Sequence, residues 1–282
     1  MLSYRHAFHA GNHADVLKHF VQVELLRYLN QKDKAWWYID THAGAGAYEL
    51  NRGFATKNAE FESGIARIID APDLPESMRP YIDLVRRLNG PGALRYYPGS
   101  PWFTAELMRD DDRMRLFELH PADADLLAQN FEQIASQVII DAADGFKGLR
   151  AYLPPPPRRG LVLIDPPYEV KTDYRTVVTT IEDALRRFAT GTYAVWYPLL
   201  QRPECHELPK QLKALPAKSW LHVNMTVHKP AISGIGMHGS GLVVLNPPWT
   251  LADTLKSTLP WLTERLGQDS HARFQLETGG DA

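Results

Sequence analysis

One eight-residue stretch, Leu161-Val162-Leu163-Ile164-Asp165-Pro166-Pro167-Tyr168, constrains the fold of this chain most strongly. Its first four residues are apolar and two of them are β-branched, which predicts a strand buried on both faces. The two prolines end that strand, because proline has no backbone N–H for a central position in a sheet. We therefore expect an α/β fold, with Asp165 and Tyr168 at the edge of an open sheet where such folds bind ligands.

The residues that end this strand suit methyl transfer to the exocyclic amine of a flipped adenine. That amine is a weak nucleophile because its lone pair is delocalised into the ring. Asp165 and the carbonyl of Pro166 could accept hydrogen bonds from its two N–H groups and localise the lone pair, while Tyr168 stacks on the base. An ordinary Asp-Pro turn explains the same residues. The tetrapeptide alone leaves both interpretations open.

Length and composition are those of a soluble globular protein. The 282 residues, 44% hydrophobic and 23% charged, suffice for one large domain with an insertion. No apolar run is long enough to cross a membrane, and the first residues lack the apolar core of a signal peptide. The single cysteine, Cys205, excludes a disulfide framework and a multi-cysteine metal site. We expect a cytoplasmic protein without a membrane segment.

The formal net charge is −2, so charge alone does not indicate a nucleic-acid partner. Residues 4–19 nevertheless combine aromatic and cationic side chains with four histidines. The histidine spacing crosses a Gly-Asn break and no cysteine assists, so we expect no metal site. Contact with a nucleotide or phosphate is the more natural use. Asn12 is placed to cap a helix over residues 13–29, whose apolar residues recur every three or four positions.

Polar residues end several further predicted strands. The strand at residues 35–40 ends in Asp40, and the small turn after it contains Gly44, which would let the backbone approach a ligand. This turn lacks the full G-x-G-x-x-G spacing. Glu118 ends a second strand and is the best candidate for a ribose-binding acid. Asp144 follows a third strand, and it could bind the adenine amine of a cofactor or only cap a helix.

The remaining elements follow from apolar spacing and turn residues. Residues 50–98 have helix-like spacing punctuated by proline and glycine, which predicts a small helical insertion. Further strands are expected at residues 192–199, 222–227 and 242–245, and a flexible loop at residues 234–241 lies near the active edge. The last strand ends in Asn246-Pro247-Pro248-Trp249, a second polar-Pro-Pro-aromatic copy. We favour Asp165 over Asn246 as the amine acceptor and expect Asn246 to shape the pocket wall.

Taken in order, these motifs resemble those of S-adenosylmethionine-dependent adenine-N6 methyltransferases. The residues that carry the resemblance are Asp40-Thr41-His42-Ala43-Gly44-Ala45-Gly46, Glu118, Asp144-Gly145 and Asp165-Pro166-Pro167-Tyr168. A further stretch narrows it: Tyr4-Arg5-His6-Ala7-Phe8-His9-Ala10-Gly11-Asn12-His13-Ala14-Asp15-Val16-Leu17-Lys18-His19. With it, nearly the whole chain resembles the RlmJ family of bacterial 23S ribosomal RNA adenine-N6 methyltransferases. The tail after about residue 266 looks less like the family, and we assign it no role.

This resemblance implies a seven-stranded, Rossmann-like class I methyltransferase with an inserted helical subdomain. The N-terminal motif segment would be residues 1–34, the core residues 35–49 and 99–266, and the insertion residues 50–98. The implied enzyme is a cytoplasmic monomer that uses S-adenosylmethionine, releases S-adenosylhomocysteine and holds no metal. Its implied substrate is adenine 2030 of protein-free 23S ribosomal RNA, methylated during ribosome biogenesis.

The resemblance also implies roles for individual residues, beside those that the residues themselves suggest. Catalysis is expected at Asp165, supported by Pro166 and Tyr168, and RNA contacts at Tyr4, His6 and Lys18. Cofactor contacts are expected at His19, His42, Ser100, Glu118, Asp144 and Gly145, with Asp40 and Gly44 added from the strand-end pattern. A DNA adenine-N6 methyltransferase, a protein glutamine methyltransferase and a non-catalytic RNA-binding scaffold remain alternatives. The aromatic, cationic N-terminus argues for nucleic acid, and the intact acids argue against a scaffold.

Overall fold

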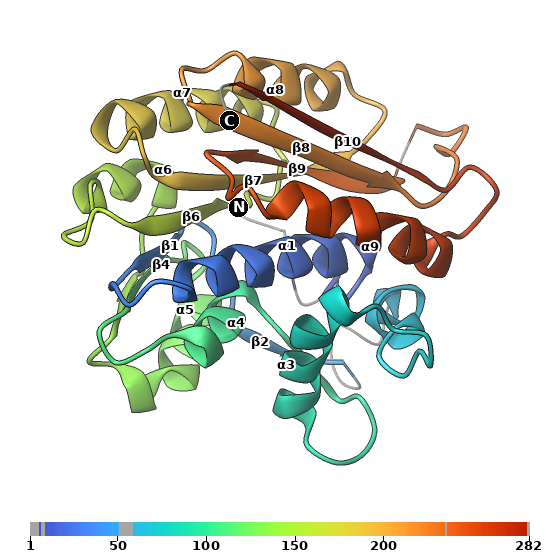
Figure 1. The fold of residues 1–282 in the computed structure, drawn as a ribbon, viewed down its shortest axis with the longest axis horizontal. Helices are drawn as coiled ribbons and strands as arrows, with labels where there is room; N and C mark the ends of the chain where they lie inside the picture. Colours follow the sequence, from blue (N-terminus) through green and yellow to red (C-terminus); the bar gives the residue numbers. More distant parts are fainter. Residues whose placement is uncertain (1–5, 7–8, 51–58, 235, 281–282) are drawn as a thin grey trace.

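A mixed sheet of eight strands forms the centre of the molecule in the computed structural model, which describes residues 6, 9–50, 59–234 and 236–280 (Figure 1). Its strands are β1 (Trp37–Asp40), β4 (Arg113–Phe117), β5 (Val138–Asp141), β6 (Gly160–Ile164), β7 (Thr192–Leu199), β8 (Ser219–Thr226), β9 (Gly239–Leu245) and β10 (Arg273–Gly280). Their spatial order is β10-β8-β9-β7-β6-β1-β4-β5. The strands from β5 to β7 pair in parallel, whereas β9, β8 and β10 pair antiparallel.

The central strand β6 divides the apolar core in two. All five of its residues are buried, as the sequence predicts. Successive side chains of a strand point to opposite faces. Leu161 and Leu163 accordingly join one buried cluster, and Val162 and Ile164 join the other. Helices must therefore cover both faces of the sheet.

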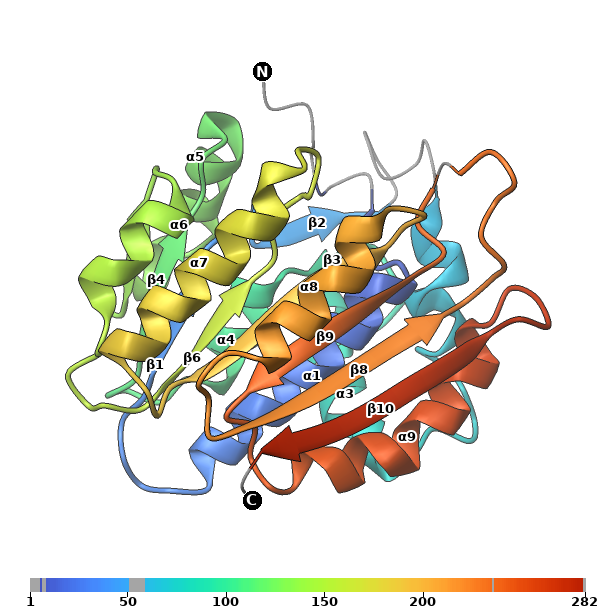
Figure 2. The ribbon, with the colours of Figure 1, turned by 90° about the horizontal axis from the view of Figure 1, so that it is seen from above.

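Figures 1 and 2 show this three-layer arrangement. One face carries α1, α4 and α9, with α3 packed outside them, and the other carries α6, α7 and α8. The α-helices are α1 (His13–Asn30), α3 (Arg79–Asn89), α4 (Ser100–Leu107), α5 (Pro121–Asn130), α6 (Gly145–Gly148), α7 (Thr172–Arg187), α8 (Pro203–Lys213) and α9 (Leu251–Leu266). None of the helices in the described ranges is long and apolar enough to span a membrane.

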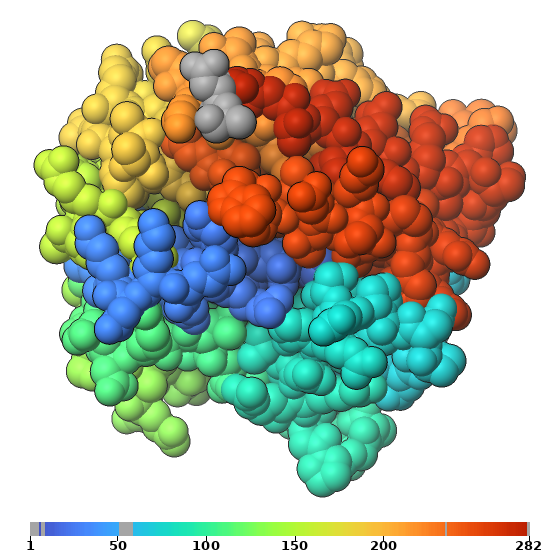
Figure 3. Space-filling model, viewed as in Figure 1, coloured from blue at the N-terminus to red at the C-terminus, as the bar shows by residue number. Residues whose placement is uncertain are grey.

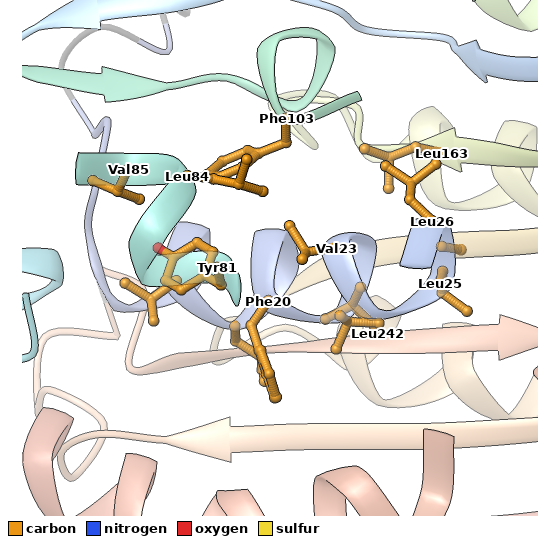
Figure 4. Close-up of a cluster of buried hydrophobic side chains, with 14 of the residues drawn as sticks. Phe20, Val23, Leu25, Leu26, Tyr81, Leu84, Val85, Phe103, Leu163 and Leu242 are labelled. Atoms are coloured by element: carbon orange, nitrogen blue, oxygen red, sulfur yellow. The ribbon is translucent and has the colours of Figure 1, made fainter. Parts of the chain in front are cut away.

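Helix α1 lies inside the protein. Asn12 caps it as expected, its side-chain oxygen accepting from the backbone N–H of Ala14 at 2.9 Å and of Asp15 at 3.0 Å. Figure 4 shows why so much of the helix is buried: Phe20 and Val23 lie between α3 and α4 on one side and β9 on the other. In the space-filling view, α1 reaches this surface along a band between α9 and the segment that includes α3 (Figure 3). Its N-terminal residues are thus fixed by packing rather than exposed.

The segment between β1 and β4 is less helical than its apolar spacing predicts. Gly64 interrupts the predicted helix, because its backbone angles (φ −114°, ψ −115°) are not helical. Only glycine fits there, since a Cβ would lie 2.1 Å from the carbonyl oxygen of Gly11. Short 3₁₀ turns form instead. A two-stranded antiparallel ribbon closes the segment. The elements are β2 (Ala47–Glu49), η2 (Glu60–Ser63), η3 (Ile65–Arg67), η4 (Glu76–Met78) and β3 (Tyr96–Pro98), with η5 (Glu132–Ile134) and η6 (Leu149–Tyr152) later in the chain. The division into a core and an insertion at residues 50–98 stays a prediction, and residues 51–58 lie outside the described residues.

The Rossmann-like class is confirmed, but the strand count is eight where seven were predicted. The added strand, β10, comes from the C-terminal tail, to which we assigned no role above. It pairs antiparallel with β8 over eight residue pairs. Phe274 and Leu276 are partly buried against the core and alternate with polar residues. That two-residue period is the pattern of a half-exposed edge strand.

Candidate active site

A cavity of about 420 Å³ opens at the carboxyl ends of β1, β4 and β6. This is the point where the strand order reverses, β4 lying on one side of β1 and β6 on the other. Open α/β sheets bind ligands at such a point, and the volume is ordinary for a ligand site. The predicted site residues that line it are His6, Lys18, His19, His42, Gly44, Ser100, Glu118, Asp144, Gly145, Asp165 and Pro166.

One wall of the cavity carries Glu118, directly after β4. Its Oε2 accepts a hydrogen bond from the backbone N–H of Gly44 at 2.8 Å, and its Oε1 accepts one from His120 at 2.7 Å. Burial raises the pKa of Glu118, although these two N–H groups act in the opposite direction. Gly44 is required by this turn: its φ is +61°, and a Cβ would lie 2.1 Å from the hydroxyl of Tyr48.

Asp144 and Gly145 form the adjoining wall. Asp144 caps α6, accepting from the backbone N–H of Phe146 at 3.0 Å, so the capping interpretation of this residue holds while its side chain also lines the cavity. Gly145 packs against the turn after β1, where an added Cβ would meet the carbonyl oxygen of Thr41 at 2.1 Å. The turn after β1 and the turn at Gly145 can therefore lie in contact only because residue 145 has no side chain.

Replacing Gly145 with alanine should separate these two turns. Because the atoms that the new Cβ would meet belong to the backbone of Thr41, the clash cannot be relieved by rotating a side chain. We expect a destabilisation of about 1–3 kcal/mol. We also expect affinity for S-adenosylmethionine, the cofactor that the family resemblance implies, to fall more than the loss of folded protein explains. Isothermal titration on the folded fraction measures this. Unchanged affinity would show that the contact between the turns does not shape the site.

Two histidines of the cavity wall are kept neutral. Burial lowers the pKa of His42 to about 4, despite the nearby charges of Asp165 and Asp144. Burial and the charge of Lys18 lower the pKa of His19 well below its usual value. The Nδ1 atom of His19 lies 2.9 Å from the hydroxyl of Tyr97. Both rings can thus serve as hydrogen-bonding groups for an uncharged part of a ligand at neutral pH.

Asp40 does not line the cavity. It is fully buried, and its Oδ2 accepts from the hydroxyls of Tyr38 at 2.7 Å and Ser100 at 2.6 Å. Its Oδ1 accepts from the backbone N–H of His42 at 3.1 Å. The prediction of a direct contact between Asp40 and a ligand is therefore not met in this arrangement. The carboxylate instead holds two cavity-lining residues, Ser100 and His42, in place.

The other half of the cavity centres on Asp165, which follows β6 directly. Lys18 Nζ lies 2.5 Å from Asp165 Oδ2 and 2.9 Å from Asp15 Oδ1. It also lies 5.8 Å from the ring centroid of Trp196. Burial alone would lower the pKa of Lys18, but the two carboxylates raise it above its ordinary range. The lysine is therefore a permanent buried cation beside the predicted catalytic carboxylate.

Tyr168 lies under the site rather than in it. Its side chain is 2% exposed, and its hydroxyl donates to the carbonyl of Trp196 at 2.7 Å. Its ring centroid is 4.5 Å from that of Tyr174. The positive φ of +52° at this residue turns the ring into the core. The prediction that Tyr168 stacks on a base is not met in this arrangement, because the ring anchors the turn from below.

The predicted RNA contacts can be placed only in part. His6 lines the cavity, with Nε2 2.9 Å from Asp15 Oδ2 and its ring 5.1 Å from that of Tyr48. Tyr4 lies outside the described residues. Sequence reasoning missed Asp15, Tyr48 and Trp196. Only Asp15 left a signal, because it stands three residues before Lys18 and so on the same side of a helix.

The second polar-Pro-Pro-aromatic copy, residues 246–249, lies at the opposite ends of the strands from the cavity, beside the amino end of β7. Strand β9 runs antiparallel to β7 and ends beside Tyr193, at the start of β7. The side chain of Asn246 donates to the carbonyls of Ala189 at 2.9 Å and Gly191 at 2.7 Å. The expectation that Asn246 shapes the pocket wall is therefore wrong. The loop before β9, by contrast, lies at the same edge as the end of β7.

The substitution Asn246→Asp should separate stability from activity. A carboxylate cannot donate to the two carbonyls that the amide now serves, so we expect a loss of about 1–3 kcal/mol in unfolding free energy. Transfer activity per folded molecule should stay within about twofold of the original, since small surface changes rarely propagate further. Thermal melting with an activity assay below the transition measures both. A selective loss of activity would return Asn246 to the list of candidate amine acceptors.

Within the described residues, no group of three or more histidine, cysteine, aspartate or glutamate side chains could hold a metal ion. The sheet order and the cavity, with acids after β4, β5 and β6, define a Rossmann-like class I methyltransferase.

Comparison with known proteins gives the particular family. The family described as "Ribosomal RNA large subunit methyltransferase D, RlmJ" matches residues 33–277, and the chain belongs to it. The chain is 48% identical to "Ribosomal RNA large subunit methyltransferase J" of Escherichia coli, over 94% of each sequence. It is 46% identical to the protein of the same name from Haemophilus influenzae, over 98% of each. A crystal structure of a Legionella pneumophila protein, 35% identical, superposes with a TM-score of 0.89 over 96% of this chain and 98% of that one.

Proposed function

We propose that this methyltransferase transfers the methyl group of S-adenosylmethionine to N6 of an adenine in 23S ribosomal RNA. The observation that carries the proposal is that one cavity holds Glu118 and Asp144 on one side and Asp165-Pro166 on the other. The names of its relatives, ribosomal RNA large subunit methyltransferases, support RNA as the acceptor. The particular base, adenine 2030, rests on the family resemblance.

The residues of the cavity fit S-adenosylmethionine. Its ribose hydroxyls and adenine amine are hydrogen-bond donors, and Glu118 and Asp144 offer carboxylate oxygens to them. Gly44 and Gly145 line the same cavity, and glycine lets the backbone of these two turns approach a ligand closely. When bound, this molecule supplies an electrophilic methyl group. Burial of Asp40 behind Ser100 and His42 keeps that wall rigid.

The acceptor side then needs groups that orient an amine rather than a strong base. The carboxylate of Asp165 and the carbonyl of Pro166 accept hydrogen bonds from the two N6–H groups and so direct the nitrogen lone pair toward the methyl group. Lys18 fixes the carboxylate from the opposite side at 2.5 Å. Asp165 takes the proton after attack, when the methylated amine is acidic. Flipping the base costs a few kcal/mol, which stacking on an aromatic ring of the cavity wall would offset, and His6 and Tyr48 both line that wall.

A ribosomal RNA substrate also bears on the setting of the enzyme. We place it in the cytoplasm, acting as a monomer on protein-free RNA before the large subunit is assembled.

The test is to supply labelled S-adenosylmethionine with protein-free 23S RNA, assembled large subunits or duplex DNA in separate reactions. We expect label in the naked RNA alone, recovered as N6-methyladenosine after digestion. Label in DNA would keep the chemistry and overturn the substrate. Cofactor binding with no label in any acceptor would favour a non-catalytic RNA-binding scaffold.

A further inference from the structure

A second carboxylate, Asp15, contacts Lys18, the lysine that also contacts Asp165. Its side chain is 3% exposed and belongs to the first turn of α1. Its Oδ2 accepts from the backbone N–H of Gly11 at 2.9 Å and lies 2.9 Å from His6 Nε2, while its Oδ1 lies 2.9 Å from Lys18 Nζ. A buried carboxylate is costly unless such partners surround it. Asp15 has three such partners, and two of them, His6 and Lys18, line the cavity.

The contacts of Lys18 indicate a function for Asp15. The ammonium group lies between Asp15 and Asp165, whose side chains are 3% and 15% exposed. Lys18 contacts Asp165 through the Oδ2 atom at 2.5 Å and Asp15 through the Oδ1 atom at 2.9 Å. A carboxylate has two acceptor oxygens, so a lysine that Asp15 holds on the Oδ2 atom of Asp165 leaves the Oδ1 atom to accept from another donor.

Asp15 sets the position of Lys18 before any substrate arrives. The two residues lie about one helical turn apart on α1, whose N-terminus is capped by Asn12. Asn12 is itself tied to Glu60, its Nδ2 donating to Glu60 Oε2 at 2.9 Å. Burial would raise the pKa of Asp15, but His6 and Lys18 hold it well below its usual range. Asp15 therefore stays ionised and keeps the lysine anchored.

We propose that Asp15 is a positioning residue for methyl transfer, which anchors Lys18 on one oxygen of Asp165 so that the other oxygen can accept from the substrate amine. This inference rests on the proposed function and adds to it a residue that touches neither substrate nor cofactor. Without Asp15, the ammonium group of Lys18 would lose its second anchor and could also reach the Oδ1 atom of Asp165, where it would compete with the amine.

The test compares Asp15→Asn with Glu24→Gln, a control on the same helix. Glu24 forms the same three-residue pair with Arg27 at 2.7 Å, away from the cavity. Single-turnover transfer to 23S RNA and affinity for S-adenosylmethionine are measured for each, with melting curves to confirm folding. We expect Asp15→Asn to slow transfer roughly 100-fold with cofactor affinity unchanged, and Glu24→Gln to match the original protein.

Two further variants separate positioning from a purely structural role. If Asp15 acts through Lys18, the double variant Asp15→Asn/Lys18→Met should transfer no more slowly than Lys18→Met alone. Additive losses, or an Asp15→Asn protein as active as the control, would overturn this inference and leave the proposed function standing. Original protein that methylates no RNA would overturn the proposed function and this inference with it.

Discussion

Replacing Asp165 with alanine will slow methyl transfer by roughly 100- to 10,000-fold, while the protein still folds and binds S-adenosylmethionine. The reason lies in the position of this carboxylate after β6, at the cavity and 2.5 Å from Lys18. Alanine removes the acceptor that localises the lone pair of the amine. Folding should survive, because Asp15 remains as a partner for the buried lysine.

The measurement is single-turnover transfer at saturating cofactor, with cofactor affinity determined separately. Asp183→Asn is the matched control, since Asp183 is an acid on α7 whose Oδ2 pairs with Arg187 at 2.7 Å, outside the cavity. The transfer rate of Asp165→Asn should lie between those of Asp165→Ala and the control, because an amide keeps one acceptor oxygen. An Asp165→Ala protein with normal turnover would remove this residue from the mechanism.

The sequence was most informative where polar residues follow buried strands. Glu118, Asp144 and Asp165 each come after a strand of a parallel sheet, and the carboxyl ends of parallel strands meet at one edge. Their convergence on one cavity therefore follows from strand direction alone. The same logic misplaced Asn246, because β9 runs antiparallel to β7 and its end lies at the far edge. Apolar composition does not reveal strand direction.

Other parts of the site depend on contacts that no local pattern encodes. Asp15 and Asp165 are far apart in sequence and share only the ammonium of Lys18. Tyr168 has an aromatic side chain suited to stacking, but a positive φ turns it toward Tyr174 in the core. The β10 strand was missed because only alternate residues of an edge strand contact the core. Backbone conformation and long-range packing, rather than residue type, decided these cases.

Replacing Lys18 with methionine will slow transfer to a small but measurable rate and will destabilise the fold by about 3 kcal/mol at neutral pH. Methionine fills a similar volume but leaves Asp15, with its side chain 3% exposed, without its ammonium partner. In the original protein, His6 and Lys18 hold the pKa of Asp15 well below its usual value. That interaction contributes stability above the unfolded pKa of an aspartate, about 4, and the contribution is lost as pH falls through the lower folded value.

The pH dependence of the loss identifies its cause. In the variant, the pKa of Asp15 should rise, so the carboxylate takes up a proton at a less acid pH and the buried charge is relieved. The difference in unfolding free energy between the two proteins should therefore be largest near pH 7 and should narrow as pH falls to about 4. Denaturant titrations across this range measure it, with Asp15→Asn/Lys18→Met, which buries neither charge, as the control. A deficit independent of pH would assign the loss to packing, and the ion pair would then have no special part in stabilising the site.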